Sequence, residues 1–552
     1  MLFEKYQSII ENAAKANQLR SFYSQYPEHP KAYGEDAAAK GEEYFKSILN
    51  RSFNSLLQEG ATEWKGEEIS PYTREKLGIT YPVFPVETLI NRAKQSSSPW
   101  IKLSVKERAA MLVSSLEKIK TRFFEVAYAT MHTTGQSFIM SFQASGPHAA
   151  DRALEAIAMG YHELTRFPEE ALWEKPVGKH NVILEKTFRP VPKGIGVVIG
   201  CSTFPVWNGV PGIYADLITG NPVIVKPHPG AVLPIALIVE EIQKAFKENG
   251  LNPNLCQLAA DSTDGLIAKQ LCEHPVVKLV DYTGGTAFGN YIESLKNKTV
   301  FTEKAGVNSV ILDSVQNMEE VAGNLAFSSC LYSGQMCTAP QNFFIPASGI
   351  RTSQDKLSYS EVVEKIKNSI NQLVNNPKTG AGTLGAIQND KTIERAQSVA
   401  HNKMEKVILQ GEAVQNPEFE HARTLSPTII ETDAANHEVY RQELFGPVIV
   451  IIKTKDTEES IRLAKEMAER QGAITCAAYT ISDDTLQYIS DEMNEVFTPV
   501  TFNLTGFIWV NQHAAFSDFH VTGGNPAGNA GFTDPLFIDK RFVWVGNRIM
   551  KP

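Results

Sequence analysis

The chain has 552 residues, too many for one ordinary hydrophobic core, so its length predicts about three or four folding units. With 43% hydrophobic and 21% charged residues, it has the composition of a globular protein rather than a disordered one. A net charge of -9 and the lack of a long basic block argue against a protein that binds nucleic acid or an anionic membrane surface.

The N-terminal sequence and the cysteines favour a cytoplasmic protein. The first residues alternate apolar and charged side chains, where a signal peptide needs an uninterrupted apolar stretch. No window approaches the roughly 18 apolar residues of a membrane-spanning helix. The six cysteines form no CxxC pair and no repeated spacing, which predicts reduced thiols and neither a disulfide framework nor a metal site.

The front of the chain is predicted to be helical. Residues 1–70 carry a helix-like pattern with a polar break at 26–30 and no chemical motif, so we expect an N-terminal helical extension. A clearer helix begins after Ser104, whose hydroxyl can cap it while Glu107 returns the bond. Apolar residues at helical spacing then predict one buried stripe: Met111, Leu112, Leu116, Ile119, Phe123 and Val126.

From about residue 178 the pattern changes to strands that alternate with helix-length segments. Residues 180–188 are predicted to be extended and 194–200 to be a fully buried strand. A helix-length segment, 209–220, separates this strand from the next, 222–225. Such alternation predicts an α/β fold with a doubly wound parallel sheet.

Two further features of this region suit a nucleotide. A glycine-rich turn, 283–289, follows a predicted strand at 276–282 and precedes a predicted helix, where amides can hold a pyrophosphate. The turn is not GxGxxG, and a tight turn without a ligand explains it equally well. Lys226 ends a predicted strand, where open α/β sheets bind ligands, although a lysine at such an end is more often only solvated.

Cys337 and Glu303 are the candidate reactive groups. Cys337 ends the motif Gly-Gln-Met-Cys and lies 34 residues after Glu303. A thiol that can become a nucleophile and a carboxylate that can activate water can together oxidise an aldehyde through a covalent thioester. An isolated cysteine is more often a small buried hydrophobic residue. The interpretation therefore depends on the order of the turn, the carboxylate and the thiol.

Together these segments resemble the aldehyde dehydrogenase superfamily over roughly residues 85 to 550. The matching stretches are 189–194, 203–205, 220–227, 283–289, 443–447 and 506–511. By this resemblance Cys337 corresponds to the nucleophile, Glu303 to the general base, and 506–511 to the strand that closes the active site. The implied cofactor-binding residues are Lys226, Thr283, Gly284, Gly285, Gly289, Glu443 and Phe445.

The resemblance also implies the domain organisation. We expect an N-terminal extension at 1–70, an NAD(P)-binding Rossmann-like domain at 71–177 and 192–306, and a catalytic α/β domain at 307–535. The implied oligomerisation element comprises 178–191 and 536–552, in a homodimer or homotetramer.

Three departures from the family pattern affect the site. The family places an asparagine before Phe-Pro as second oxyanion donor, whereas this chain has Thr203, which can still donate; Asn208 is the alternative. Pro229 replaces the acid that grips the adenosine ribose of NAD, so NADP becomes at least as suitable as NAD. The residues around Glu303 read Thr-Glu-Lys-Ala-Gly rather than LELGG.

The long N-terminal region, the His228-Pro229 pair and the stretch 201–205 resemble the PaaN-like branch of phenylacetic acid degradation proteins. This branch implies oxidation of a coenzyme A-linked semialdehyde, formed by ring opening, to an acid. Since no residues after 550 could encode the hydratase that opens the ring, we expect a separate hydratase partner.

Two other functions are compatible with the fold. A CoA-acylating dehydrogenase releases the acyl group by thiolysis, but such enzymes commonly lack the general-base glutamate that Glu303 represents. A non-catalytic scaffold or binding protein would have lost Cys337 or Glu303, and both are present.

Overall fold

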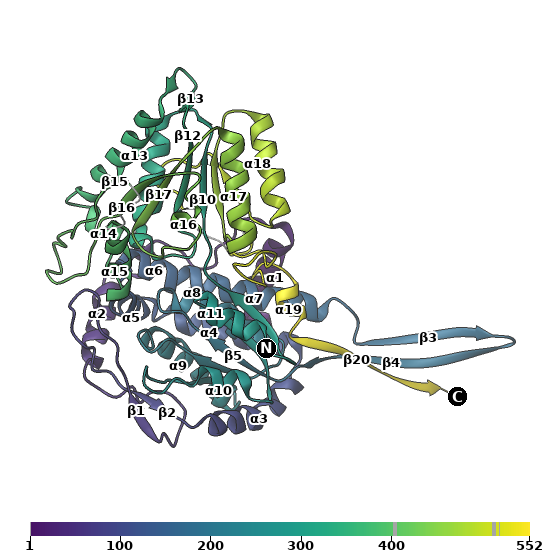
Figure 1. Ribbon diagram of the computed structural model, residues 1–552. Coiled ribbons are helices and arrows are strands. Elements are labelled where there is room, and N and C mark those ends of the chain that lie inside the picture. Colours follow the sequence, from purple (N-terminus) through teal and green to yellow (C-terminus); the bar gives the residue numbers. More distant parts are fainter. Residues whose placement is uncertain (1, 401–405, 510–514, 518, 552) are drawn as a thin grey trace.

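The computed structural model describes residues 2–400, 406–509, 515–517 and 519–551 (Figure 1). One of its two large sheets has five parallel strands in the order β7-β6-β5-β8-β9. These strands are β5 (Ile195–Ile199), β6 (Val223–Lys226), β7 (Cys256–Leu258), β8 (Val277–Thr283) and β9 (Thr299–Glu303). Every residue of β5 is buried, as its apolar sequence predicts. The connecting helices are α8 (Pro205–Ile218), α9 (Leu233–Glu248), η2 (Pro253–Leu255), α10 (Ala268–Glu273) and α11 (Thr286–Glu293).

The second large sheet has the order β15-β16-β17-β12-β10-β18-β19 and is parallel except at its edge strand β15. Its strands are β10 (Ser309–Leu312), β12 (Asn342–Pro346), β15 (Lys406–Leu409), β16 (Thr428–Asp433), β17 (Val448–Thr454), β18 (Cys476–Tyr479) and β19 (Val500–Phe502). Its helices are α12 (Met318–Cys330), η3 (Leu331–Gly334), α13 (Tyr359–Val374), α14 (Gly380–Leu384), α15 (Asp390–Ala400), α16 (His437–Tyr440), α17 (Thr457–Gln471) and α18 (Asp483–Glu495). A small sheet joins β11 (Ser314–Val315), β13 (Ile350–Thr352) and β14 (Lys356–Leu357). The predicted α/β class is confirmed.

A layer of helices packs on α8 and α9, on one side of the five-stranded sheet. It consists of α4 (Val105–Lys120), α5 (Phe123–Thr134), α6 (Phe138–Ser145) and α7 (Pro147–Thr165). On the other face of the sheet, α3 (Val86–Lys102) contacts β5, β6 and β7. Ser104 and Glu107 form the predicted capping box at the start of α4. All residues of the predicted stripe are buried, but Phe123 and Val126 belong to α5 rather than to α4.

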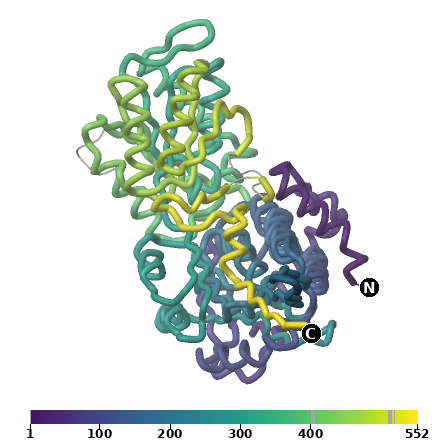
Figure 2. The backbone as a smooth tube through the Cα atoms, turned by 90° about the vertical axis from the view of Figure 1, so that its right-hand side faces the viewer, coloured from purple at the N-terminus to yellow at the C-terminus, as the bar shows by residue number. Residues whose placement is uncertain are grey.

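The N-terminal region packs along the outside of this layer. It contains α1 (Leu2–Leu19), η1 (Pro30–Tyr33), α2 (Ala37–Ile48) and the hairpin strands β1 (Glu63–Lys65) and β2 (Tyr81–Val83). Figure 2 shows α1 beside the helices it contacts, α4 and α7. Buried Glu68 accepts bonds from the backbone N–H groups of Val232 (2.6 Å) and Leu233 (2.9 Å), and so ties this region to the start of α9.

A three-stranded antiparallel arm projects from the body (Figure 1). It has the order β20-β4-β3, with β3 (Glu170–Val177), β4 (His180–Pro192) and β20 (Phe542–Lys551), and α19 (Leu536–Asp539) precedes β20. At its root the fully buried guanidinium of Arg541 binds Asp216 (2.6 Å) and Asp281 (2.5 Å), which joins β20 to α8 and β8. Among the described residues, no helix is long and apolar enough to cross a membrane.

The segment expected to close the active site differs from the prediction. Gly506 and Phe507 form a turn, and Ile508 and Trp509 adopt no regular structure. The carbonyls of Gly506 and Ile508 accept bonds from the side chain of Asn324 (2.9 and 3.0 Å) and not from the backbone of a neighbouring strand. Residues 510 and 511 lie outside the described residues. The predicted strand is therefore not formed over 506–509.

Candidate active site

The loop that carries Cys337 begins with an unusual backbone. Tyr332, Ser333 and Gly334 have positive φ angles of 52°, 51° and 64°, which non-glycine residues seldom adopt. A Cβ atom on Gly334 would lie 2.5 Å from the carbonyl oxygen of Gly446, so only glycine fits. The chain therefore turns sharply after α12 and presents Cys337 beside the end of the five-stranded sheet.

Side-chain amides hold this loop. Asn308 donates to the carbonyl oxygens of Cys337 (2.7 Å) and Ala339 (3.1 Å). Gln335 accepts a bond from the backbone N–H of Gln388 (2.9 Å). The backbone N–H of Cys337 donates to no group in the described part of the chain, so it is open to an oxyanion on a substrate.

Glu303, the last residue of β9, is buried with both carboxylate oxygens engaged. Asn208 of α8 donates through Nδ2 to Oε2 (2.9 Å), and Nε2 of His520 lies 3.1 Å from Oε1. Burial alone would raise the pKa of Glu303, but His520, Cys337 and Arg152 outweigh it and hold the pKa below the usual value. Glu303 is therefore a carboxylate at neutral pH.

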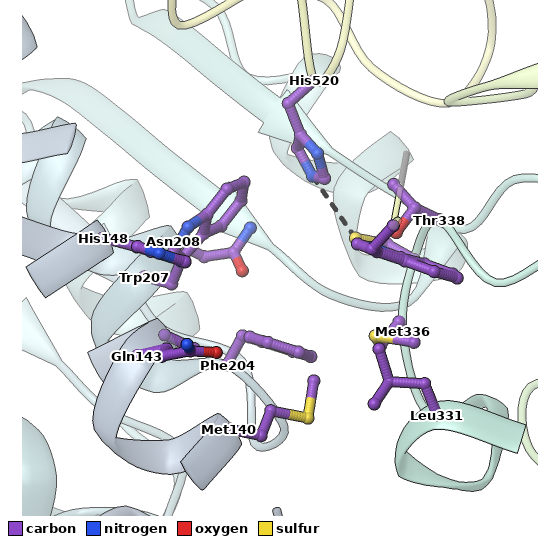
Figure 3. Close-up of a pocket in the computed structure, with 13 residues that line it drawn as sticks. Met140, Gln143, His148, Phe204, Trp207, Asn208, Leu331, Met336, Thr338 and His520 are labelled. Carbon is purple, nitrogen blue, oxygen red and sulfur yellow. Dashed lines mark hydrogen bonds between the residues drawn. The ribbon is translucent and has the colours of Figure 1, made fainter. Parts of the chain in front are cut away.

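The thiol of Cys337, in contrast to Glu303, favours its protonated form. Burial raises its pKa well above the ordinary value, and the Glu303 carboxylate adds to the rise. The sulfur lies 3.3 Å from Nε2 of His520, and Figure 3 shows the imidazole directed at it. Without a bound ligand, Cys337 is therefore a thiol next to an imidazole and a carboxylate.

His520 is the residue of this cluster that sequence reasoning missed. It lies 183 positions after Cys337, in a glycine-rich stretch that contains no recognisable motif. Its ring packs edge-on against Trp207 at 4.7 Å. Nothing short of the three-dimensional contact could have assigned it to the site.

Two cavities meet at Cys337. The first, the apolar cavity, encloses about 110 Å³, and the second, the large cavity, about 700 Å³. Phe204, Asn208 and Cys337 line both. The other residues of the apolar cavity, all drawn in Figure 3, are Met140, Gln143, Ala144, His148, Trp207, Leu331, Met336, Thr338, Trp509 and His520. The thiol can thus react with a molecule in either cavity.

Comparison with known proteins decides the family. Residues 60–531 match the model of the aldehyde dehydrogenase family. The chain belongs to this family. A solved NAD-dependent aldehyde dehydrogenase from Burkholderia multivorans is 41% identical, with a TM-score of 0.97 over 100% of this chain and 99% of that one. The predicted family and fold class are confirmed.

Among characterised relatives, the similarity is lower but extensive. The benzaldehyde dehydrogenase [NAD(+)] of Pseudomonas putida is 24% identical over 483 residues, which cover 86% of this chain and 90% of the relative. The 1-pyrroline-5-carboxylate dehydrogenase of Bacillus subtilis (strain 168) is 24% identical over 73% of this chain and 76% of its own length.

In this aldehyde dehydrogenase, most of the predicted cofactor residues surround the large cavity. The predicted cofactor residues that line it are Lys226, Thr283, Gly284, Gly285, Glu443 and Phe445, and all four predicted catalytic residues, Thr203, Asn208, Glu303 and Cys337, line it as well. Apart from its two chain neighbours, no atom of the described residues lies within 4 Å of a Cβ built on Gly285, so a phosphate could approach this backbone closely. Gly289 is not part of the lining; a Cβ there would lie 2.5 Å from the side chain of Lys304. Gly289 thus serves packing.

Lys226 is not simply solvated. Its Nζ lies 2.8 Å from Oδ1 of Asp261, and both side chains are buried. Across the large cavity, burial raises the pKa of Glu443 to about 7, although Arg395 opposes the rise. Arg395 also donates to the carbonyl of Phe445 (2.6 Å), which holds this loop at the cavity edge. The cavity thus offers a cation, a carboxyl group and an open glycine turn, which suit a dinucleotide.

Proposed function

We propose that this enzyme oxidises an aldehyde to a carboxylate with NAD or NADP, through a thioester on Cys337. The observation that carries the proposal is the position of Cys337 where the two cavities meet, with Glu303 beside it. An aldehyde in the apolar cavity and a dinucleotide in the large cavity would then meet at the thiol. The similarity to the NAD-dependent aldehyde dehydrogenase of Burkholderia multivorans supports this assignment.

The chemistry divides between the cofactor and the protein. A bound nicotinamide supplies the acceptor for the hydride that leaves the aldehyde carbon. The sulfur of Cys337 forms the bond to that carbon, and the carbonyl electrons move to oxygen, where the Cys337 backbone N–H can stabilise the charge. Glu303 then takes a proton from the water that attacks the thioester. Thr203 or Asn208 is the proposed second oxyanion donor.

The hydrolytic route is favoured over CoA acylation because the carboxylate of Glu303 is present and lies in the same cluster as the thiol. In Glu303→Gln, reduced cofactor should appear in one burst while steady turnover falls by about 10²–10⁴-fold, the usual contribution of a general base. Loss of the burst together with turnover would mean that Glu303 acts before hydride transfer.

We infer that both dinucleotides bind and that the surroundings of Lys226 set their ratio. Pro229 supplies no carboxylate to repel a 2′-phosphate, which favours NADP. Asp261 opposes this preference for NADP, because its carboxylate pairs with Lys226 and so neutralises the charge that could attract a 2′-phosphate. Titration of the protein with each cofactor measures the ratio, and a tenfold difference corresponds to about 1.4 kcal/mol.

For the substrate, we propose a CoA-linked semialdehyde of the kind formed by phenylacetate ring opening, supplied by a separate hydratase. The apolar cavity has room for the aldehyde end, while the CoA group would remain outside and orient the carbonyl through its own contacts. Compared with its free-acid counterpart, the CoA-linked semialdehyde should show a higher turnover number and not merely a lower KM. Equal kcat/KM values would favour a general enzyme for apolar aldehydes.

We also propose the domain boundaries expected from the sequence and an assembly of more than one chain. The arm exposes a set of apolar side chains that a second copy of the chain could cover: Leu172, Trp173, Val177, Val191, Val543, Val545, Ile549 and Met550. We propose a homodimer or homotetramer in the cytoplasm that is joined through this arm. Light scattering should give a mass of two or four chains; a mass of one chain would contradict it.

A further inference from the structure

His520 lies between the two groups that the proposed reaction uses. Its imidazole is buried, and a single nitrogen, Nε2, is 3.3 Å from the sulfur of Cys337 and 3.1 Å from Oε1 of Glu303. The ring is wedged between Trp207, which meets it edge-on at 4.7 Å, and Phe532, which stacks on it at 6.4 Å. The imidazole is therefore held in place and directed at the thiol.

The N-terminal region helps to fix the segment that precedes His520. Tyr23 packs edge-on against Phe516 (5.3 Å), and the guanidinium of Arg20 lies over the ring of Phe519 (4.6 Å). These contacts give the extension a structural connection to the reactive cluster that its sequence did not indicate.

Cys337 needs a group that removes its proton. Only the thiolate is an effective nucleophile, yet burial and the Glu303 charge raise the pKa of this thiol. Glu303 holds that proton weakly, because its pKa lies below the usual value and Asn208 already donates to its Oε2. An imidazole has an intrinsic basicity much closer to neutrality.

We propose that His520 is a further catalytic residue, which takes the thiol proton of Cys337 at Nε2 before the sulfur attacks the aldehyde. The S–H bond breaks, its electron pair stays on sulfur, and an N–H bond forms at Nε2. The imidazole that accepts this proton carries its other proton on Nδ1. After the transfer, the Nε2–H group lies between the thiolate and the Glu303 carboxylate, and both anions attract it.

The proton returns when the reaction ends. Hydrolysis of the thioester expels the thiolate, which takes the proton back from Nε2, while Glu303 passes the proton of the attacking water to solvent. His520 is then neutral again. The inference rests on the proposed function, since it supplies the step that starts that reaction.

Several charged or titratable groups lie around His520 in the described part of the chain. Glu303 on β9 and Cys337 on the loop after η3 lie next to Nε2, and His148 on α7 lines the same cavity. Arg152 on α7, paired with Glu155, places its guanidinium 4.5 Å from the ring of Trp207, which packs against His520. Nδ1 of His520 has no hydrogen-bond partner among the described residues.

Alkylation of Cys337 tests the transfer without aldehyde or cofactor. His520→Gln retains a hydrogen-bonding side chain but cannot take up the proton. The rate of iodoacetamide addition to Cys337, followed by mass spectrometry of its peptide, should fall about tenfold or more at neutral pH and recover only at higher pH. The matched control is His274→Gln, a histidine away from the site that pairs with Glu87; its rate should equal that of the wild type.

Two results would overturn the proposal. One is an alkylation rate in His520→Gln within twofold of the wild type at every pH. The other is a slow rate in His520→Ala that added imidazole does not raise, because a missing base is replaced by free imidazole whereas a lost positioning contact is not. If the wild type oxidises no aldehyde but alkylation depends on His520 as described, the proposed function fails and this inference stands.

Discussion

Asn208 offers a quantitative test of how Glu303 is tuned. Its amide donates to Oε2 of the carboxylate at 2.9 Å, and Asn208→Ala removes that bond. A hydrogen bond to a charged group contributes about 1.5–3 kcal/mol, and one pKa unit equals about 1.36 kcal/mol. The pKa of Glu303 should therefore rise by about one to two units.

The sign of the effect on turnover follows from the role of Glu303. The residue acts as a carboxylate, so a higher pKa moves the acid limb of the steady-state rate to higher pH by the same amount. Below that limb, turnover of Asn208→Ala should fall about tenfold for each pH unit by which the limb moves. Above it, the variant should turn over as fast as the wild type. Stopped-flow absorbance of the reduced nicotinamide, measured across the pH range, separates the burst from the steady state.

The same experiment decides between two roles for Asn208. If its amide were the second oxyanion donor, Asn208→Ala would slow the burst by about 10²–10³-fold and leave the acid limb where it was. That result would refute the role of Asn208 in lowering the pKa of Glu303 and would make it the oxyanion donor. Thr203→Val, which removes the other candidate hydroxyl at nearly constant volume, is the matched comparison: it should slow the burst without moving the acid limb.

Three further predictions follow from single contacts. Cys337→Ala should abolish cofactor reduction, whereas Cys330→Ala, at a fully buried thiol on α12, should keep its turnover; the reverse would reassign the nucleophile. Asp261→Asn should free Lys226 and raise the affinity for NADP relative to NAD by about tenfold in a fluorescence titration, and an unchanged ratio would contradict this. Arg541→Met leaves two buried carboxylates unpaired and should destabilise the fold by about 3–5 kcal/mol, seen as a lower melting temperature; an unchanged value would show that the network contributes nothing.

Local signals made much of the fold predictable. The capping box at Ser104 involves residues three apart, and the buried strand at 194–200 is an unbroken apolar run, so both can be identified in a short window. The failure at 506–509 has a non-local cause, because the carbonyls there bind Asn324, which is 182 residues from Gly506. Which partner a carbonyl finds depends on packing that a sequence window does not contain.

Some residues of the candidate site could likewise be predicted from the sequence, whereas others could not. Cys337 and Glu303 could be proposed from residue type, order and spacing, because their chemistry is carried by the side chains themselves. The direction of Asn208 toward Glu303 and the pairing of Lys226 with Asp261 depend on contacts 95 and 35 residues apart along the chain. His520 has no motif around it, so only the fold could bring it to the thiol.

The central claim is that Cys337 forms a thioester which water hydrolyses. Oxidation of an aldehyde in water labelled with ¹⁸O, followed by mass spectrometry of the product, tests it most directly. We expect a carboxylic acid that carries at least one labelled oxygen from water, one reduced nicotinamide for each acid formed, and neither product from Cys337→Ala. Release of an acyl-CoA only when free coenzyme A is added, or cofactor reduction that persists in Cys337→Ala, would contradict it.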